Sequence, residues 1–131
     1  MKREWSLLDL DFFFKEYPEL KRDDIQIGID EMNKDKILSV IRQNSDRFKK
    51  ILRTIMKNEY NNELYRKEDL SKKTSNIYAM RFRRSENIRI YCKEYKNGKK
   101  IIMMRWILKK SQKSQKIKNI IDNLGRYEYD L

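Results

Sequence analysis

Arginines, lysines and tyrosines alternate with apolar residues after Asn76, and side chains of these types can bind phosphate groups and nucleobases. In the segments IYAMRFR and NIRIYCKEY the alternating polar positions are Arg81, Arg83, Arg89, Tyr91 and Lys93. Alternate residues of a β-strand share one face of the sheet. We therefore expect a sheet surface on which cations contact phosphates while tyrosine rings stack on the bases of single-stranded RNA. For Tyr95, ordinary packing against a neighbouring strand is the favoured interpretation.

A second basic group lies in RWILKKSQKSQKIKN, residues 105–119, where an apolar segment leads into five lysines separated by Ser and Gln. Such a segment is either the solvated start of a helix or a surface that holds phosphates. The preceding strand brings these lysines to an edge of the basic sheet face, which favours phosphate binding. The candidate RNA-binding residues are Arg83, Arg84, Lys93, Arg105, Lys113 and Lys116.

The positive charge is concentrated in the C-terminal part of the chain. The 131 residues carry 32 Lys and Arg against 20 Asp and Glu, a formal net charge of +12. Residues 77–126 hold 15 of the basic and 3 of the acidic residues, so the remainder is balanced at 17 of each. An asymmetry of this kind is typical of a protein that binds a polyanion, although some basic proteins have no nucleic-acid partner.

Composition excludes several other classes of site. The chain has no histidine and a single cysteine, Cys92, so we expect no zinc site, no intramolecular disulfide and no cofactor. No segment reaches the roughly 18 apolar residues of a membrane span, and the first residues, MKREWSLLDLDFFFKE, are too acidic for a secretory signal. We expect a soluble, cytoplasmic protein that does not bind membranes.

The elements that must position the basic residues form one α+β domain over residues 1–131. Residues 1–63 are expected to be a helical extension or layer, in which residues 5–17 are a strand or a short helix. Two amphipathic helices follow between residues 35 and 57, the second starting at Ser45, and their apolar stripes should cover one face of the sheet. Residues 58–76 are polar and are expected to be a loop.

Residues 64–131 are expected to hold a small antiparallel sheet and a C-terminal helix. RSEN and the Asn-Gly pair at 97–98 are turn signals that join three strands into a meander. KIIMMRWIL is apolar on both faces apart from Arg105, which is typical of a central strand covered on both sides. The final helix should end at Gly125 and bury Ile117, Ile120, Ile121 and Leu124.

The order of these segments resembles the RelE/HigB superfamily of toxins from toxin-antitoxin systems. The similar part runs over roughly residues 64–131, through YAMRFRRSENIRIYCKEYKNGKKIIMMRWILKKSQKSQ, the amphipathic helix and the ending GRYEYDL. The lysine segment matches the family's KKTQKTP pattern except that Gln115 replaces its proline. A histidine that some members use is missing, and the sixty residues before the match exceed what a minimal toxin needs. The resemblance implies a RelE-like fold.

The resemblance also implies an endoribonuclease that cuts messenger RNA, commonly on the ribosome. RNA carries its own nucleophile, the 2′-hydroxyl, so a metal-independent protein need only align it, remove its proton and stabilise the phosphorane. Arg89 in NIRIYC matches the family's sheet arginine and is the first choice for the scissile phosphate. The other catalytic candidates are Arg81, Lys109, Lys110 and Tyr91.

Two classes of function are consistent with these residues. The first is the toxin, which acts on mRNA, inhibits translation and is held inactive by an acidic antitoxin protein. The second is a non-catalytic RNA-binding or protein-interaction module on the same scaffold, which the missing histidine and the altered lysine segment favour. The assembled strand pattern favours the toxin, which is the predicted function. The proton-transfer groups remain open, with a lysine of lowered pKa or Tyr91 as the candidates.

Overall fold

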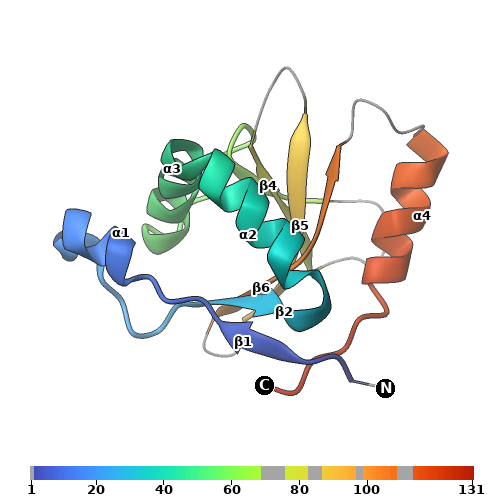
Figure 1. Ribbon diagram of the computed structural model, residues 1–131, viewed down its shortest axis with the longest axis horizontal. Coiled ribbons are helices and arrows are strands. Elements are labelled where there is room, and N and C mark those ends of the chain that lie inside the picture. The colour runs from blue at the N-terminus through green and yellow to red at the C-terminus, as the bar shows by residue number, and fades with distance from the viewer. Residues whose placement is uncertain (1, 69–75, 83–86, 97–98, 109–113) are drawn as a thin grey trace.

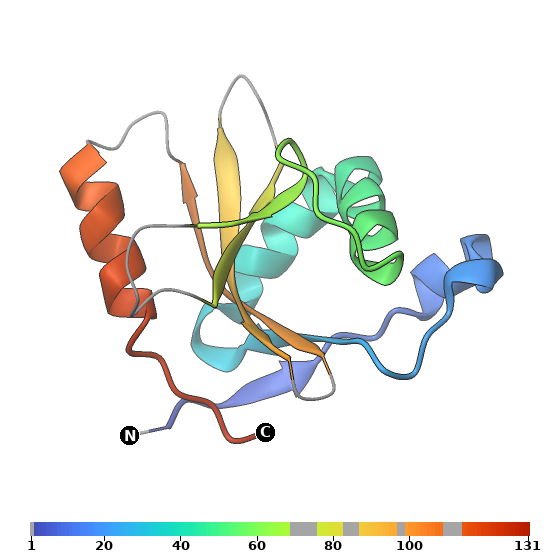
Figure 2. The same cartoon turned by 180° about the vertical axis from the view of Figure 1, so that it is seen from behind.

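The alternating segments after Asn76 form the centre of a six-stranded mixed sheet with helices on both faces (Figures 1 and 2). The computed structural model describes residues 2–68, 76–82, 87–96, 99–108 and 114–131. The strands are β1 Trp5–Leu7, β2 Gln26–Asp30, β3 Tyr65–Lys67, β4 Ile77–Arg81, β5 Ile88–Tyr95 and β6 Lys100–Leu108. The helices are α1 Asp11–Glu16, η1 Pro18–Leu20, η2 Glu31–Asn33, α2 Lys34–Gln43, α3 Ser45–Met56 and α4 Ser114–Leu124. The coarse α+β class predicted from the sequence is confirmed.

The expected meander is present within a larger sheet. β4, β5 and β6 pair antiparallel in succession, and β6 lies between β2 and β5 as a central strand. The strand order is β1-β2-β6-β5-β4-β3, and β2 runs parallel to β6. The prediction of a small antiparallel sheet is therefore wrong, because the edge of β6 away from β5 pairs with β2 from the N-terminal part, and the side chains of β6 are buried on both faces.

The N-terminal segment contributes strands as well as helices. In Ile25–Ile29 the isoleucines alternate with Gln26 and Gly28, and this short pattern becomes β2, which was expected to belong to a helical layer. Gly28 has a packing reason: a Cβ at this position would lie 2.5 Å from a ring carbon of Trp5 in β1. β1 pairs antiparallel with β2, and the indole ring of Trp5 lies directly against the glycine.

One face of the sheet, the α2–α3 face, carries the larger core. The apolar stripes of the two helices pack on Tyr78, Met80, Ile90, Cys92, Ile101 and Met103, all buried. Phe48 of α3 stacks on Phe82 with ring centroids 6.1 Å apart. The two amphipathic helices and the face that they cover thus follow the sequence prediction.

The opposite face, the α4 face, carries a second core. The four apolar residues expected on the inner side of the C-terminal helix are buried there beside Ile77, Ala79, Tyr91, Ile102 and Met104. The register of β5 and β6 shifts between Tyr91 and Cys92, so Cys92 lies opposite Met103 and Tyr91 lies opposite Arg105. This bulge inserts Met104 and turns Arg105 toward the α4 face, because opposite residues of paired strands share a face.

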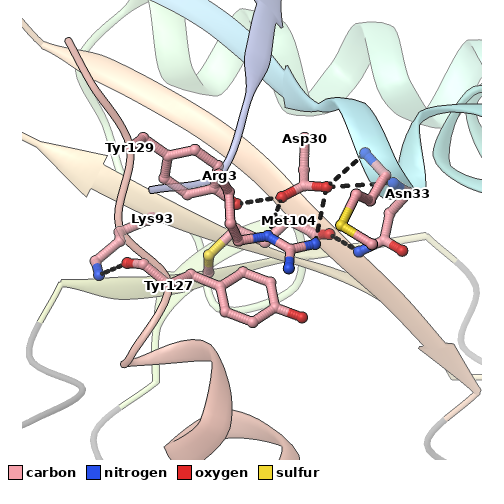
Figure 3. A network of polar contacts seen from close by, with 8 residues as sticks. Arg3, Asp30, Asn33, Lys93, Met104, Tyr127 and Tyr129 are labelled. Carbon is pink, nitrogen blue, oxygen red and sulfur yellow. Dashed lines mark hydrogen bonds and ion pairs between the residues drawn. The ribbon is translucent and has the colours of Figure 1, made fainter. Parts of the chain in front are cut away.

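The two ends of the chain meet at a buried carboxylate (Figure 3). Asp30, at the end of β2, is fully buried and accepts hydrogen bonds from Arg3 Nε at 2.6 Å and from the Tyr129 hydroxyl at 2.7 Å. The backbone N–H groups of Met32 and Asn33 donate to its other oxygen, at 2.9 and 3.2 Å. The N-terminal strand and the C-terminal tail are thereby held side by side across the sheet edge.

Candidate functional site

The strand register assembles a row of chemically active side chains across the α4 face. Arg66 in β3 lies opposite Ala79, Ala79 lies opposite Tyr91, and Tyr91 lies opposite Arg105. Neighbouring strands are about 4.8 Å apart, so the small side chain of Ala79 leaves space between the larger ones. The row brings residues from four strands together, and Tyr91 is at its centre.

The next position along the strands holds a second pair of arginines. Arg81 lies directly opposite Arg89 on the same face. Arg89 donates from Nη1 to Glu68 Oε1 at 3.2 Å, and both side chains are buried, with Arg89 only 2% exposed. Arg81 donates to the carbonyl oxygen of Asn62 at 2.7 Å. A carboxylate, a buried arginine and a buried tyrosine thus share a site with two further arginines, which we call the arginine–tyrosine site: Arg66, Glu68, Arg81, Arg89 and Tyr91.

The burial and the close spacing of charges in the site shift the pKa values of its residues. Burial lowers the pKa of Arg81, and the neighbouring Arg89 and Arg66 lower it further. Burial raises the pKa of Tyr91 to about 12; Glu68 raises it as well, whereas Arg89 acts in the opposite direction. The phenol of Tyr91 is therefore protonated at neutral pH and is suited to donating a proton or hydrogen bond rather than to accepting one.

Three buried polar atoms in this site have no hydrogen-bond partner of acceptable geometry among the described residues: Arg66 Nε, Arg89 Nε and the Tyr91 hydroxyl oxygen. Buried polar groups are nearly always paired, so an unpaired group calls for an explanation. All three are potential hydrogen-bond donors on one face of β3 and β5, and a cluster of donors with excess positive charge matches the oxygens of a phosphate group.

The structure brings some of the predicted site residues together and separates others. Arg81, Arg89 and Tyr91 share the arginine–tyrosine site, and Arg105 follows in the row. The expected outward, exposed position of Arg89 is wrong, because the α4 face is a packed layer in which Arg89 pairs with Glu68. Five candidates lie outside the described residues: Arg83, Arg84, Lys109, Lys110 and Lys113.

Lys93 is also buried instead of lying on an open surface. Its ammonium group donates to the carbonyl oxygens of Tyr127 at 2.6 Å and Gly125 at 3.3 Å, and burial lowers its pKa (Figure 3). It therefore ties β5 to the segment that follows α4. Lys116 is exposed on the first turn of α4 and lines a pocket with Arg105.

Sequence reasoning missed two members of the site, Arg66 and Glu68. Residues 58–76 were expected to be a loop, whereas β3 forms at Tyr65–Lys67 and pairs with β4. The only local signal is the apolar pair Leu64 and Tyr65 within a polar segment, which is too short to identify a strand. Glu68 is brought to Arg89 by this pairing, because its backbone N–H donates to the carbonyl oxygen of Ile77 at 2.8 Å.

Within the described part of the chain, no group of three or more His, Cys, Asp and Glu side chains is placed to hold a metal ion. No helix of that part is long and apolar enough to cross a membrane. No family model, curated protein or solved structure matches the chain. The function of the chain is therefore inferred from its own residues.

Proposed function

We propose that the chain is a toxin of a toxin-antitoxin pair that cleaves messenger RNA without a metal ion, in the cytoplasm and on the ribosome. The observation that carries this proposal is the presence, on one sheet face, of three buried polar atoms on Arg66, Arg89 and Tyr91 that lack a hydrogen-bond partner within the described residues, beside Arg81 and the carboxylate of Glu68. Arginines bind phosphate oxygens in a two-pronged geometry, and a carboxylate and a phenol supply the two proton-transfer groups that RNA cleavage needs.

The reaction starts from the 2′-hydroxyl of the RNA. Its oxygen attacks the adjacent phosphorus, its proton passes to the Glu68 carboxylate, and the bond from phosphorus to the 5′-oxygen breaks. The products are a 2′,3′-cyclic phosphate and a free 5′-hydroxyl. Arg81 and Arg89 stabilise the charge that develops on the phosphoryl oxygens, which is the larger part of catalysis in reactions of this kind.

Tyr91 completes the reaction as the proton donor to the departing 5′-oxygen. Its pKa of about 12 is higher than that of an ordinary tyrosine, so the hydroxyl stays protonated throughout the physiological pH range. Glu68 lies against Arg89, so substrate phosphate entering the site competes with the carboxylate for the guanidinium group. This competition releases Glu68 to accept the proton at the moment when the phosphate is bound.

Expression in cells tests the proposal. Controlled expression of the wild-type chain should arrest growth and create new RNA 5′ ends that carry hydroxyl groups. Glu68→Gln and Tyr91→Phe should each lower the cleavage rate by about 100-fold or more, because each removes one proton-transfer group.

Tyr95→Phe is the matched control, since Tyr95 is a partly buried tyrosine of the same strand that packs on the same face as the fully buried Tyr91. It should leave the cleavage rate unchanged. A wild-type chain that neither slows growth nor creates RNA ends, or a Tyr91→Phe variant as active as Tyr95→Phe, would contradict the catalytic assignment.

The proposal includes an acidic antitoxin, because a toxin must be inactive in its own cell and a net charge of +12 attracts an acidic protein. A small acidic protein from the neighbouring gene should co-purify with this chain, and the affinity should fall as salt rises. Failure of any such protein to bind would remove the toxin-antitoxin part of the proposal while leaving RNA cleavage standing.

A second function, RNA binding without cleavage, is favoured by the complete burial of Tyr91 and by the neutralisation of Arg89 by Glu68. On this alternative the site is a structural cluster and RNA binds to the exposed cations around it. Tyr91→Phe would then leave both growth and RNA binding unchanged, whereas substitution of exposed cations would weaken RNA binding.

A further inference from the structure

A pocket of about 510 Å³ lies beside the last residues of β6, at the edge of the sheet. β2 pairs with β6 only as far as Met103, so within the described residues the part of β6 after Met104 is paired with β5 alone. α2 and α4 lie on either side of β6 (Figure 1). Residues of both helices line the pocket together with the last residues of β6. We call this space the edge pocket, and its volume is in the range of small-ligand sites.

The charges in the edge pocket are all positive. Lys36 of α2, Arg105 of β6 and Lys116 of α4 line it, and no acidic residue of the described part of the chain does. Among the described residues, none of these three cations forms an ion pair, and both lysines are exposed. Three cations from three separate elements therefore converge on one space without a counter-charge, which indicates an anionic occupant.

Two aromatic side chains complete the lining. Trp106 and Tyr127 both line the pocket and are partly buried. The guanidinium group of Arg3 lies 3.8 Å from the centre of the Tyr127 ring and holds this ring in position (Figure 3). Aromatic rings beside cations are the combination that binds single-stranded nucleic acid, because the rings stack on bases while the cations contact phosphates.

Arg105 connects the edge pocket to the arginine–tyrosine site, because it lines the pocket and lies directly opposite Tyr91 in the strand register. Lys36 belongs to the part of the chain before residue 64, so the N-terminal segment would contribute directly to substrate binding.

We propose that the edge pocket binds a nucleotide of the RNA next to the scissile phosphate, with its base against Trp106 or Tyr127 and its phosphate held by Lys36, Arg105 and Lys116. This inference rests on the proposed action on RNA and adds the place of a neighbouring nucleotide. It assigns to α2 a role in recognising the substrate.

The test uses a short 2′-O-methyl RNA oligonucleotide, which lacks the nucleophile and cannot be cleaved, so that binding is measured apart from catalysis. Lys36→Gln and Lys116→Gln should each raise the Kd about tenfold, the loss expected for one charge-assisted phosphate contact. Each should also reduce the slope of log Kd against log salt concentration by about 0.7, the value for one phosphate contact in a single strand.

Lys118→Gln is the matched control, because Lys118 is an exposed lysine of the same helix that does not line the edge pocket. It removes the same charge and should change both quantities much less. Unfolding midpoints should be unchanged in all three variants, since exposed lysines contribute little to stability. In a Trp5→Phe background, Trp106 is the one remaining tryptophan, and its fluorescence should be quenched when the oligonucleotide binds.

The outcomes separate this inference from the proposed function. If Lys36→Gln and Lys116→Gln bind the oligonucleotide as Lys118→Gln does, the inference is wrong while RNA binding stands. If the wild-type chain cleaves RNA in cells but does not bind the oligonucleotide, the inference again fails alone. If the wild-type chain neither binds nor cleaves, both fail. Loss of affinity for an acidic protein partner, with oligonucleotide binding intact, would make the edge pocket a protein-docking site and also overturn the inference.

Discussion

At the scale of single residues, Arg89 shows how a neighbour changes what a cation does. A guanidinium group that is 2% exposed is stable only beside a counter-charge, and Glu68 supplies it at 3.2 Å. The pair is part of the fold, and in the proposed reaction it is also the switch that releases a proton acceptor. Arg89 therefore contributes to stability and, in the proposed reaction, to catalysis, and the two contributions must be measured separately.

Removing one partner of this pair should strongly destabilise the protein. Arg89→Ala leaves the Glu68 carboxylate buried without a counter-charge, so we expect a loss of about 3–5 kcal/mol in the free energy of unfolding. The double variant Arg89→Leu with Glu68→Leu should recover most of that loss, because no charge remains buried. Urea unfolding of the two variants and of the exposed control Arg53→Ala measures the difference. Equal stability of Arg89→Ala and Arg53→Ala would show that the pair contributes nothing.

At the scale of elements, contact between α3 and the sheet depends on a stacked aromatic pair. Phe82 is 3% exposed and its ring stacks on Phe48. Phe82→Ala should lower the free energy of unfolding by about 3–5 kcal/mol, the usual loss for a buried phenylalanine. Phe12 also stacks on Phe48 but is 45% exposed, so Phe12→Ala should cost much less in the same urea titration. Similar losses for both variants would place Phe82 outside the core.

The contact between β1 and β2 depends on a glycine. A Cβ on residue 28 would meet the rigid ring of Trp5 at 2.5 Å, so Gly28→Ala must displace β1. Overpacking of this kind costs about 1–3 kcal/mol. The penalty should shrink when Trp5→Leu is also present, because the smaller side chain leaves room for the methyl group. Chemical unfolding of the four proteins of this cycle gives the coupling between the two positions, and additive losses would rule out the contact.

At the scale of the whole molecule, tyrosine hydroxyls are distributed through both cores and set the response to alkaline pH. Burial, as the largest effect, raises the pKa of six of them: Tyr60, Tyr65, Tyr78, Tyr91, Tyr95 and Tyr129. An unfolded chain releases these protons near pH 10, whereas the fold retains them to higher pH. The stability that they contribute is therefore complete below about pH 10 and is lost as the pH rises through the folded pKa values.

For Tyr91 the expected loss of stability at alkaline pH can be given as a free energy. Its pKa is about 12 in the fold, so its contribution should disappear between about pH 10 and about pH 12 and amount to about 3 kcal/mol. The free energy of unfolding should fall less steeply with pH in Tyr91→Phe than in the wild-type chain over that interval. Urea unfolding at a series of alkaline pH values tests this, and parallel curves for the two proteins would contradict it.

Much of the architecture could be predicted because its causes are local. The period of two in residues 77–95 determined which side chains share a face, so the pairing of β4, β5 and β6 agrees with the sequence pattern. The position of Arg105 opposite Tyr91 depends instead on the bulge in this pairing, which a strict period of two does not predict. The helical stripes of α2, α3 and α4 likewise determined their buried sides. A hydrophobic pattern is sufficient here, because each element must turn its apolar side away from water.

Other features were decided only by contacts between distant parts of the chain. The parallel pairing of β2 with β6 and the formation of β3 depend on edges that the neighbouring strands provide, and no local pattern specifies them. The meeting of Glu68 with Arg89, the burial of Lys93 under the C-terminal tail, and the approach of Lys36 to Lys116 all follow from that packing. The sequence alone determined that a basic sheet face exists; the tertiary structure decided which of its cations are neutralised inside the protein and which remain exposed, because that depends on what packs against each one.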